Sequence, residues 1–282
     1  MTYYLNPDGH RFHYQDRGDG PAVLLVHSWA MDSAIWEYLI TDLVAAGYRC
    51  VAMDRRGHGR SDEPGAGYDL DTLADDLAAL LEHLDLREVT AVGHSMGCGE
   101  IVRYLGRHGD GRIARAAFLG AIAPYLRGAV GEQFYRANLT ELTTDRPAWF
   151  ATRADGYFAR PASGVSRALA DEAMAVALRT PLAVLTDCVA AGAGTDLTDE
   201  LPRVRVPVLV VHGDADQSAP LELTGRPTAR LLPDARLLTY PGGAHGLYVT
   251  HRDRLTTDLL GFLELYRNRG SNMPANSPAC GP

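Results

Sequence analysis

The stretch Gly93-His94-Ser95-Met96-Gly97 decides how this chain is to be understood. It has the pattern G-x-S-x-G and lies between an apolar run, 89–92, and a helix-like stretch, 96–105. A serine between a strand and a helix in this pattern is typical of a sharp turn that raises a nucleophilic hydroxyl above a sheet. Glycines on both sides leave room where a Cβ would collide with backbone. The same five letters also occur in ordinary turns, so the remaining chain has to supply a base and an acid.

Apolar runs and helical patterns alternate on both sides of this stretch. Short, continuously apolar runs are typical of strands buried on both faces, and they are found at 22–26, 50–53, 89–92 and 116–119. Helical spacing is found at 35–46 and 73–84. A hairpin of residues 3–5 and 11–14, around Asn6-Pro7-Asp8-Gly9, precedes the first apolar run. The alternation predicts an α/β fold with a doubly wound, mostly parallel central sheet.

The alternation stops after the fourth apolar run. The next block is helical, irregular and rich in aromatic residues, and strand patterns return only at 206–211 and 236–240, before a last helix over 252–267. Since such sheets accept insertions in loops at one end, we predict an inserted helical lid, although extra core helices of one undivided domain are the alternative. The predicted segments are the N-terminal part of the core (1–123), the lid (124–204), the C-terminal part of the core (205–268) and a disordered tail (269–282).

Composition restricts the class of protein. The 282 residues carry a net charge of −8 without a basic stripe, which argues against a nucleic-acid partner. The N-terminus lacks the pattern of a signal peptide, and no apolar run approaches membrane-spanning length. The scattered Cys50, Cys98, Cys188 and Cys280 indicate neither a zinc site nor a disulfide framework. We therefore expect a cytoplasmic protein without a metal or a membrane partner; a homo-oligomer is compatible with the sequence.

The glycine-rich loop 54–62 resembles a phosphate-binding loop only superficially. It lacks the lysine–serine ending of such loops and does not open a helix. We interpret it as structural, with Asp54 and Arg55 making local hydrogen bonds.

The base for Ser95 is sought among ten histidines. In sheets of this kind the order along the chain is serine, then acid, then histidine, which leaves His212, His245 and His251 as candidates. His245 is favoured because its loop, 241–246, follows the last strand and can carry an imidazole over the sheet edge. His94 is expected to point into the packing behind the serine. Four further histidines are expected to be solvated: His10, His13, His83 and His108.

The acid is sought at the end of the preceding strand. The stretch His212-Gly213-Asp214-Ala215-Asp216-Gln217 offers two aspartates. One can cap the turn, and the other can accept a hydrogen bond from the imidazole and fix its tautomer. Asp214 suits the turn and Asp216 the imidazole, by a modest preference.

Several stretches together resemble the bacterial arylesterase and cofactor-free haloperoxidase (perhydrolase) branch of the α/β-hydrolases. The resemblance extends from Tyr3 to about Tyr266. The matching stretches are 36–38, 54–62, 74–76, 93–97, 187–189, 212–217 and 245–246. The resemblance implies an α/β-hydrolase fold without a cofactor and a Ser95–Asp216–His245 triad. It also implies an oxyanion hole formed by the backbone N–H groups of Trp29 and Met96.

Two positions depart from the family pattern. Ser28 replaces the glycine usual before Trp29, which either reshapes the loop or adds a hydroxyl that bonds to substrate or loop. Cys98 replaces a glycine after the elbow, and we expect a small buried side chain there and not a second nucleophile. The expected substrate contacts are Ser28, Trp29, Tyr125 and Leu247.

The predicted function is hydrolysis of a small, aryl or apolar carboxylic ester through an acyl-enzyme. Lactone, amide or thioester hydrolysis and perhydrolysis would use the same serine. A ligand-sensing protein of this fold without turnover is the alternative from another class. Dehalogenase and epoxide-hydrolase chemistry is disfavoured, since those relatives carry an aspartate in place of Ser95.

Overall fold

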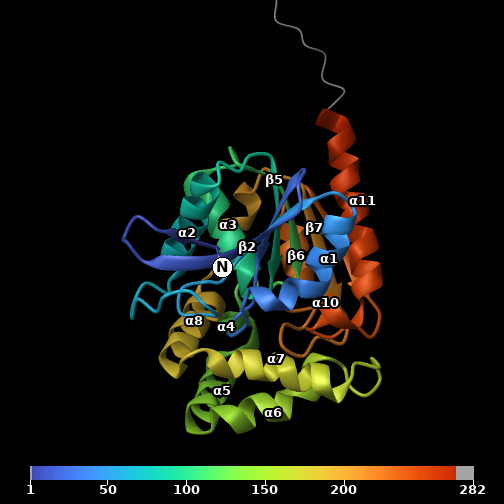
Figure 1. Ribbon diagram of the computed structural model, residues 1–282. Coiled ribbons are helices and arrows are strands. Elements are labelled where there is room, and N and C mark those ends of the chain that lie inside the picture. The colour runs from blue at the N-terminus through green and yellow to red at the C-terminus, as the bar shows by residue number, and fades with distance from the viewer. Residues whose placement is uncertain (1, 271–282) are drawn as a thin grey trace, which may run out of the picture.

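The computed structural model describes residues 2–270, and an eight-stranded sheet runs through its centre (Figure 1). The strand order is β1-β2-β4-β3-β5-β6-β7-β8. The bounds are β1 Thr2–Leu5, β2 Arg11–Arg17, β3 Ala22–Val26, β4 Arg49–Met53, β5 Val89–His94, β6 Ile113–Leu119, β7 Val208–Gly213 and β8 Ala235–Tyr240. The hairpin β1–β2 pairs antiparallel with β4, and all strands from β4 to β8 are parallel. The predicted α/β fold is therefore confirmed.

The apolar runs are continuous because both faces of the sheet are covered. Along β3, Leu24 and Val26 pack on one face, and Val23 and Leu25 pack on the other. One face carries α2 (Leu70–His83), α3 (Met96–His108) and α9 (Gly225–Leu231). The other carries η1 (Ser33–Trp36), α1 (Glu37–Ala45), α10 (Leu247–Thr250) and α11 (Arg252–Gly270) (Figure 1). Because side chains alternate along each strand, the strands contribute side chains to two separate cores.

Between β6 and β7 the chain leaves the sheet and forms a helical segment. Its elements are α4 (Leu126–Val130), α5 (Glu132–Thr144), α6 (Arg146–Tyr157), α7 (Arg167–Arg179), α8 (Leu182–Gly194) and η2 (Leu201–Arg203). Helices α5, α6 and α7 lie together beyond one end of the sheet (Figure 1). Their apolar side chains, among them Leu142, Phe150 and Met174, form a third core with Ala30 and Met31 from the loop after β3. The predicted lid segment, 124–204, coincides with this helical block, and its role as a lid stays a prediction.

The structure differs from the predicted boundaries in several places. Helix α2 starts at Leu70, before the expected 73, because the Asp69 carboxylate accepts a hydrogen bond from Thr72 N and caps the helix. Helices α9 and α10 were not expected from the sequence pattern. Helix α11 continues to Gly270, two residues into the predicted tail, and the rest of that tail lies outside the described residues.

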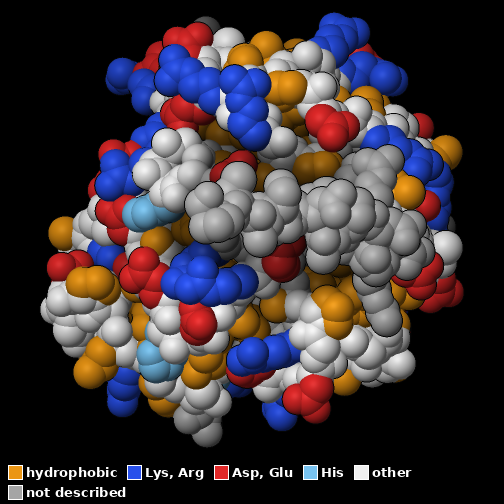
Figure 2. All heavy atoms as spheres, turned by 90° about the horizontal axis from the view of Figure 1, so that it is seen from above, with side chains coloured by type: hydrophobic (Ala, Val, Ile, Leu, Met, Phe, Trp, Pro, Cys, Tyr) orange, Lys and Arg blue, Asp and Glu red, His pale blue; other side chains and the backbone are white. Residues whose placement is uncertain are grey.

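The end of the molecule away from α5–α7 has a mixed surface. Acidic and basic side chains alternate there with apolar atoms (Figure 2). Across residues 2–270, no single helix has the length and apolar character to cross a membrane; α7 and α8 together would meet those criteria only as a pair bent by 96°.

Candidate active site

Ser95 sits in a strained turn between β5 and α3. Its φ of 55° and ψ of −113° lie in a region that L-residues rarely adopt, and its N–H donates to the carbonyl of Leu119 at 2.8 Å. A Cβ on Gly93 would lie 2.7 Å from the amide nitrogen of Cys98, and one on Gly97 would lie 2.4 Å from the carbonyl oxygen of Val26. Both glycines of the G-x-S-x-G pattern are therefore required by close backbone packing around the serine.

Asp216 and His245 form a buried pair at the ends of β7 and β8. Asp216 Oδ2 lies 2.7 Å from His245 Nδ1, and each residue is 5% exposed. Asp216 Oδ1 accepts hydrogen bonds from the N–H groups of Ser218 at 2.9 Å and Ala219 at 2.8 Å. Burial by itself would raise the pKa of Asp216, but the charge and hydrogen bond of His245 and the Ala219 N–H outweigh it and lower the pKa. The carboxylate is thus held ionised against the imidazole.

The two loops that carry this pair touch each other through backbone. A Cβ on Gly213 would lie 2.0 Å from the carbonyl oxygen of Gly243, so the loops can approach only because this position has no side chain. Asp214 accepts a hydrogen bond from Gly242 N at 2.7 Å and joins the loops a second time. Asp214 therefore holds a turn, and Asp216 faces the imidazole, as the sequence suggested.

The other histidines near the sheet edge are held in structural contacts. His94 Nε2 lies 3.0 Å from the carbonyl oxygen of His245, and His212 Nε2 lies 2.6 Å from that of Ala219. His27 lies between the Ser28 carbonyl and the Arg55 N–H. Burial lowers the pKa of all three. His251, the remaining late candidate, faces the carbonyl of Pro241 at 3.2 Å.

The expectation of a solvated His13 is wrong. His13 is 3% exposed, and its Nδ1 lies 3.1 Å from Asp54 Oδ2. Its strand, β2, pairs with β4, and the loop 54–62 that follows β4 covers it; that pairing is not visible in local sequence.

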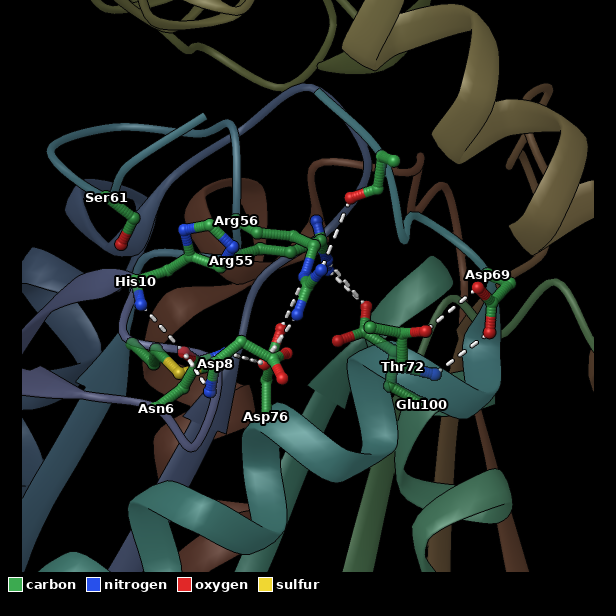
Figure 3. A network of polar contacts seen from close by, with 12 residues as sticks. Asn6, Asp8, His10, Arg55, Arg56, Ser61, Asp69, Thr72, Asp76 and Glu100 are labelled. Carbon is green, nitrogen blue, oxygen red and sulfur yellow. Dashed lines mark hydrogen bonds and ion pairs between the residues drawn. The ribbon is translucent and has the colours of Figure 1, made fainter. Parts of the chain in front are cut away.

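The loop after β3 is clamped by a buried arginine. Arg55 donates to the carbonyl of His27 at 2.6 Å and to that of Ser28 at 3.2 Å, and its guanidinium is paired with Glu100 on α3 (Figure 3). Arg55 and Glu100 are 2% and 1% exposed. Beside them, Arg56 forms a separate buried pair with Asp76 on α2 (Figure 3). Because Trp29 comes next in the chain, Arg55 holds the backbone from which the Trp29 N–H would be presented.

Trp29 itself joins the loop to the helical block. Its indole Nε1 donates to the carbonyl of Leu185 on α8 at 2.8 Å, and its ring stacks on Phe150 of α6 with centroids 5.8 Å apart. Met96 lies in the first turn of α3, where backbone N–H groups have no partner within the helix.

A cavity of about 740 Å³ lies between the sheet edge and the helical block. Ser95, His245, Trp29 and Met96 all line it. Most of the remaining wall is apolar and comes from the helical block, with Leu126, Phe134, Trp149, Phe150, Tyr157 and Val189. The structure therefore brings the nucleophile and base candidates, and both residues of the predicted oxyanion hole, to one chamber.

Comparison with known proteins agrees with this arrangement. Residues 21–252 match a family model described as the alpha/beta hydrolase fold. The chain belongs to the α/β-hydrolase family. It is 40% identical to a non-heme chloroperoxidase of Kitasatospora aureofaciens, covering 93% of this chain and 99% of that one. It is 31% identical to a bifunctional esterase/perhydrolase of Acinetobacter calcoaceticus, with the same shares.

A solved structure gives the same result. A bromoperoxidase from Bacillus anthracis superposes with a TM-score of 0.88 at 34% identity, covering 93% of this chain and all of that one. The resemblance to the haloperoxidase and perhydrolase branch is thus confirmed.

Two expected substrate contacts of this α/β-hydrolase do not line the cavity. Leu247 is 0% exposed and packs in the core beside α1 and α11, because α10 turns it away from the chamber. Tyr125 precedes α4 and its ring lies against Gly128. Ser28 and Trp29 do line the chamber.

Cys98 is buried in the hydrolase core, as expected. It is 0% exposed, and its thiol faces the carbonyl of Gly93 at 3.3 Å. Burial raises the pKa of the thiol.

The sequence predicts local hydrogen bonds from Arg55, whereas its side chain donates to the carbonyls of His27 and Ser28 and pairs with Glu100 on α3. Sequence reasoning missed Glu100 itself, Gly120 beside the Asp216–His245 pair, and Tyr157 against His245. Gly120 directly follows β6, and this place at a strand end is the one signal that could have drawn attention to it. Within the described part of the chain, no cluster of three or more His, Cys, Asp and Glu side chains is arranged to hold a metal ion.

Proposed function

We propose that this α/β-hydrolase cleaves a carboxylic ester through an acyl-enzyme, with Ser95 as nucleophile, His245 as base and Asp216 as the orienting acid. The observation that supports it best is the 2.7 Å contact between Asp216 and His245, at a chamber that Ser95 also lines. A buried carboxylate on Nδ1 leaves Nε2 of the imidazole to accept a proton, as a base for serine requires.

In the proposed reaction, His245 takes the Ser95 proton as the serine oxygen attacks the ester carbonyl. The Trp29 and Met96 N–H groups hold the negative charge that develops on the carbonyl oxygen. His245 then protonates the departing alcohol, and water hydrolyses the acyl-enzyme with His245 again as base. This chain's residues supply each proton transfer, so the proposal needs no metal or organic cofactor.

The proposed substrate is an apolar or aryl ester. The chamber is large enough for a drug-sized molecule, and its walls are predominantly aliphatic and aromatic. Trp29, stacked on Phe150, offers an aromatic wall close to Ser95.

The test is Ser95→Ala assayed on an activated aryl ester, together with labelling of the wild type by a fluorophosphonate. We expect a loss of kcat of about 10⁵-fold or more and no labelling of the variant, because a triad without its nucleophile retains only residual catalysis. Ser163→Ala, at a serine in the loop before α7, serves as the control and should keep both properties. A wild-type protein that binds esters but is not labelled would point instead to a ligand-sensing protein. Full activity of Ser95→Ala would contradict the proposed mechanism.

Perhydrolysis is the second candidate, because the related proteins are named haloperoxidases and an esterase/perhydrolase. There hydrogen peroxide replaces water as acceptor, so that an acyl-enzyme and hydrogen peroxide give a peracid and free Ser95. A panel of aryl esters, lactones, amides, thioesters, and acetate with peroxide would rank the activities. Location in the cytoplasm and oligomeric state stay predictions.

A further inference from the structure

The hydroxyl of Ser28 is a buried polar group without a partner. Ser28 is 3% exposed, and its Oγ forms no hydrogen bond to any residue in the described part of the chain. The Ser28 carbonyl is held by Arg55, so the backbone that carries this side chain is fixed. Ser28 lines the same chamber as Ser95 and His245. A buried hydroxyl that native packing leaves unsatisfied calls for an explanation, and a ligand in the chamber provides one.

Tyr157 brings a second hydroxyl to the same place from α6. Its ring meets the His245 ring edge to face, with centroids 5.4 Å apart, and its carbonyl accepts a hydrogen bond from Gly246 N at 2.7 Å. Tyr157 also lines the chamber. Its hydroxyl oxygen lies 3.4 Å from that of Tyr248, which is a long contact for a hydrogen bond. The last turn of α6 is therefore hydrogen-bonded to the loop that carries His245. This contact holds the Tyr157 side chain beside His245.

Both residues line the chamber, so their hydroxyls belong to the wall of one site. Burial raises the pKa of Tyr157 well above its ordinary value. Tyr157 is therefore a neutral hydroxyl at ordinary pH, and each of the pair can both donate and accept a hydrogen bond. An ester oxygen can only accept, whereas a water molecule needs partners of both kinds, typically two to four.

We infer that Ser28 and Tyr157 bind the water molecule that attacks the acyl-enzyme. The inference rests on the proposed function and specifies which chain groups deliver the second reactant. Ser28 adjoins Trp29, the proposed oxyanion donor, and Tyr157 contacts His245, so a water held by both hydroxyls lies on the base side of the chamber. The bound water passes one proton to His245 Nε2 while its oxygen bonds to the acyl carbon. Ser95 Oγ then leaves that carbon and takes the proton back from His245, which releases the acid and the free enzyme.

The two half-reactions make this inference testable. Ser28→Ala and Tyr157→Phe remove one hydroxyl each and keep the rest of the side chain. In rapid mixing with 4-nitrophenyl acetate, we expect each variant to hydrolyse the acetyl-enzyme about tenfold more slowly, as for one lost hydrogen bond in the transition state. The burst of nitrophenol and the rate of fluorophosphonate labelling should stay within about twofold, since no water takes part in acylation. Mass spectrometry should show acetylated Ser95 accumulating in both variants.

Tyr48→Phe is the matched control. Tyr48 is also a buried tyrosine whose hydroxyl has no partner in the described residues, but it packs beside α1, away from the chamber. It should change neither half-reaction. Equal slowing of acylation and deacylation in Ser28→Ala or Tyr157→Phe would overturn the inference, as would unchanged deacylation in both. A wild type that never labels at Ser95 would instead overturn the proposed function, so the two failures are distinct.

Discussion

At the scale of single residues, the Asp216–His245 pair depends on the absence of a side chain at position 120. Gly120 directly follows β6 and has a φ of +54°, and its N–H donates to the carbonyl of Val211. A Cβ there would lie 3.3 Å from His245 Nδ1 and 3.4 Å from Asp216 Oδ2. The position therefore combines a backbone conformation that favours glycine with contact to both members of the pair.

Gly120→Ala is expected to impair activity beyond its cost in stability. The positive φ alone should destabilise the fold by about 1–2 kcal/mol, and the added methyl should move His245 and lower kcat by about tenfold or more. Gly109→Ala is the control, because Gly109 has a φ of +74° with nothing within 4 Å of an added Cβ. Chemical denaturation should show similar losses for the two variants. Equal kcat values would contradict the role given to Gly120.

At the scale of secondary-structure elements, Arg55 links three of them. It follows β4, pairs with Glu100 on α3, and holds the carbonyls of His27 and Ser28 after β3. A lysine could keep the charge opposite Glu100, but a single ammonium cannot reproduce the planar fork that reaches both carbonyls. The shape of the Trp29 loop is thus held by a residue that does not line the chamber.

Arg55→Lys should therefore act on catalysis through the loop. We expect kcat to fall by about tenfold or more with a smaller change in KM, since one misplaced oxyanion donor affects the transition state most. Arg56→Lys alters the neighbouring buried pair with Asp76; Arg56 donates to Asp76 and to the Ala66 carbonyl, so this variant should lose stability while keeping kcat. Steady-state kinetics and urea denaturation of both variants separate the two effects. A parallel loss of kcat in Arg56→Lys would show that the effect is general destabilisation.

At the scale of the whole molecule, burial of several histidines couples folding to pH. Burial lowers the pKa of His27, His58, His94 and His212, and that of His58 falls to about 3. Between its folded pKa and the ordinary value near 6.5, each such histidine binds a proton only in the unfolded chain. The contribution of these histidines to stability is therefore fully present above about pH 6.5, and it declines as the pH falls towards 3. Glu100 and Asp76, whose pKa values burial raises, act in the opposite direction.

The contribution of one histidine can be isolated with His58→Gln. His58 is 1% exposed and its Nδ1 faces the carbonyl of Arg56 at 2.9 Å. Between about pH 6 and pH 4, the free energy of unfolding of the variant should fall less steeply than that of wild type, by about 1.4 kcal/mol per pH unit. Urea denaturation at three pH values measures how the free energy of unfolding changes with pH. Parallel slopes for wild type and His58→Gln would refute the contribution given to His58.

The sequence by itself was sufficient to predict the sheet and to place Ser95, Asp216 and His245 at or after the ends of β5, β7 and β8. Continuous apolar runs predict buried parallel strands because both faces are covered, and β3, β4, β5 and β7 have this character. Ser95 and His245 could be located because strand ends and their loops are local features. Asp216 and not Asp214 contacts the imidazole, a difference that depends on position within one short loop, and the catalytic role of the pair stays a prediction.

Only the tertiary structure decided which groups from distant parts of the chain meet around the chamber. Arg55 with Glu100, Gly120 with His245, and Tyr157 with His245 are contacts between elements far apart in the chain, and no local periodicity encodes them. The same limit explains why Tyr125 and Leu247 were expected in the chamber, because the direction of a side chain after a strand depends on the helix that follows. His13 was expected in solvent because the loop that buries it comes some forty positions later. Local pattern determines which elements form, whereas long-range packing determines which side chains line the chamber.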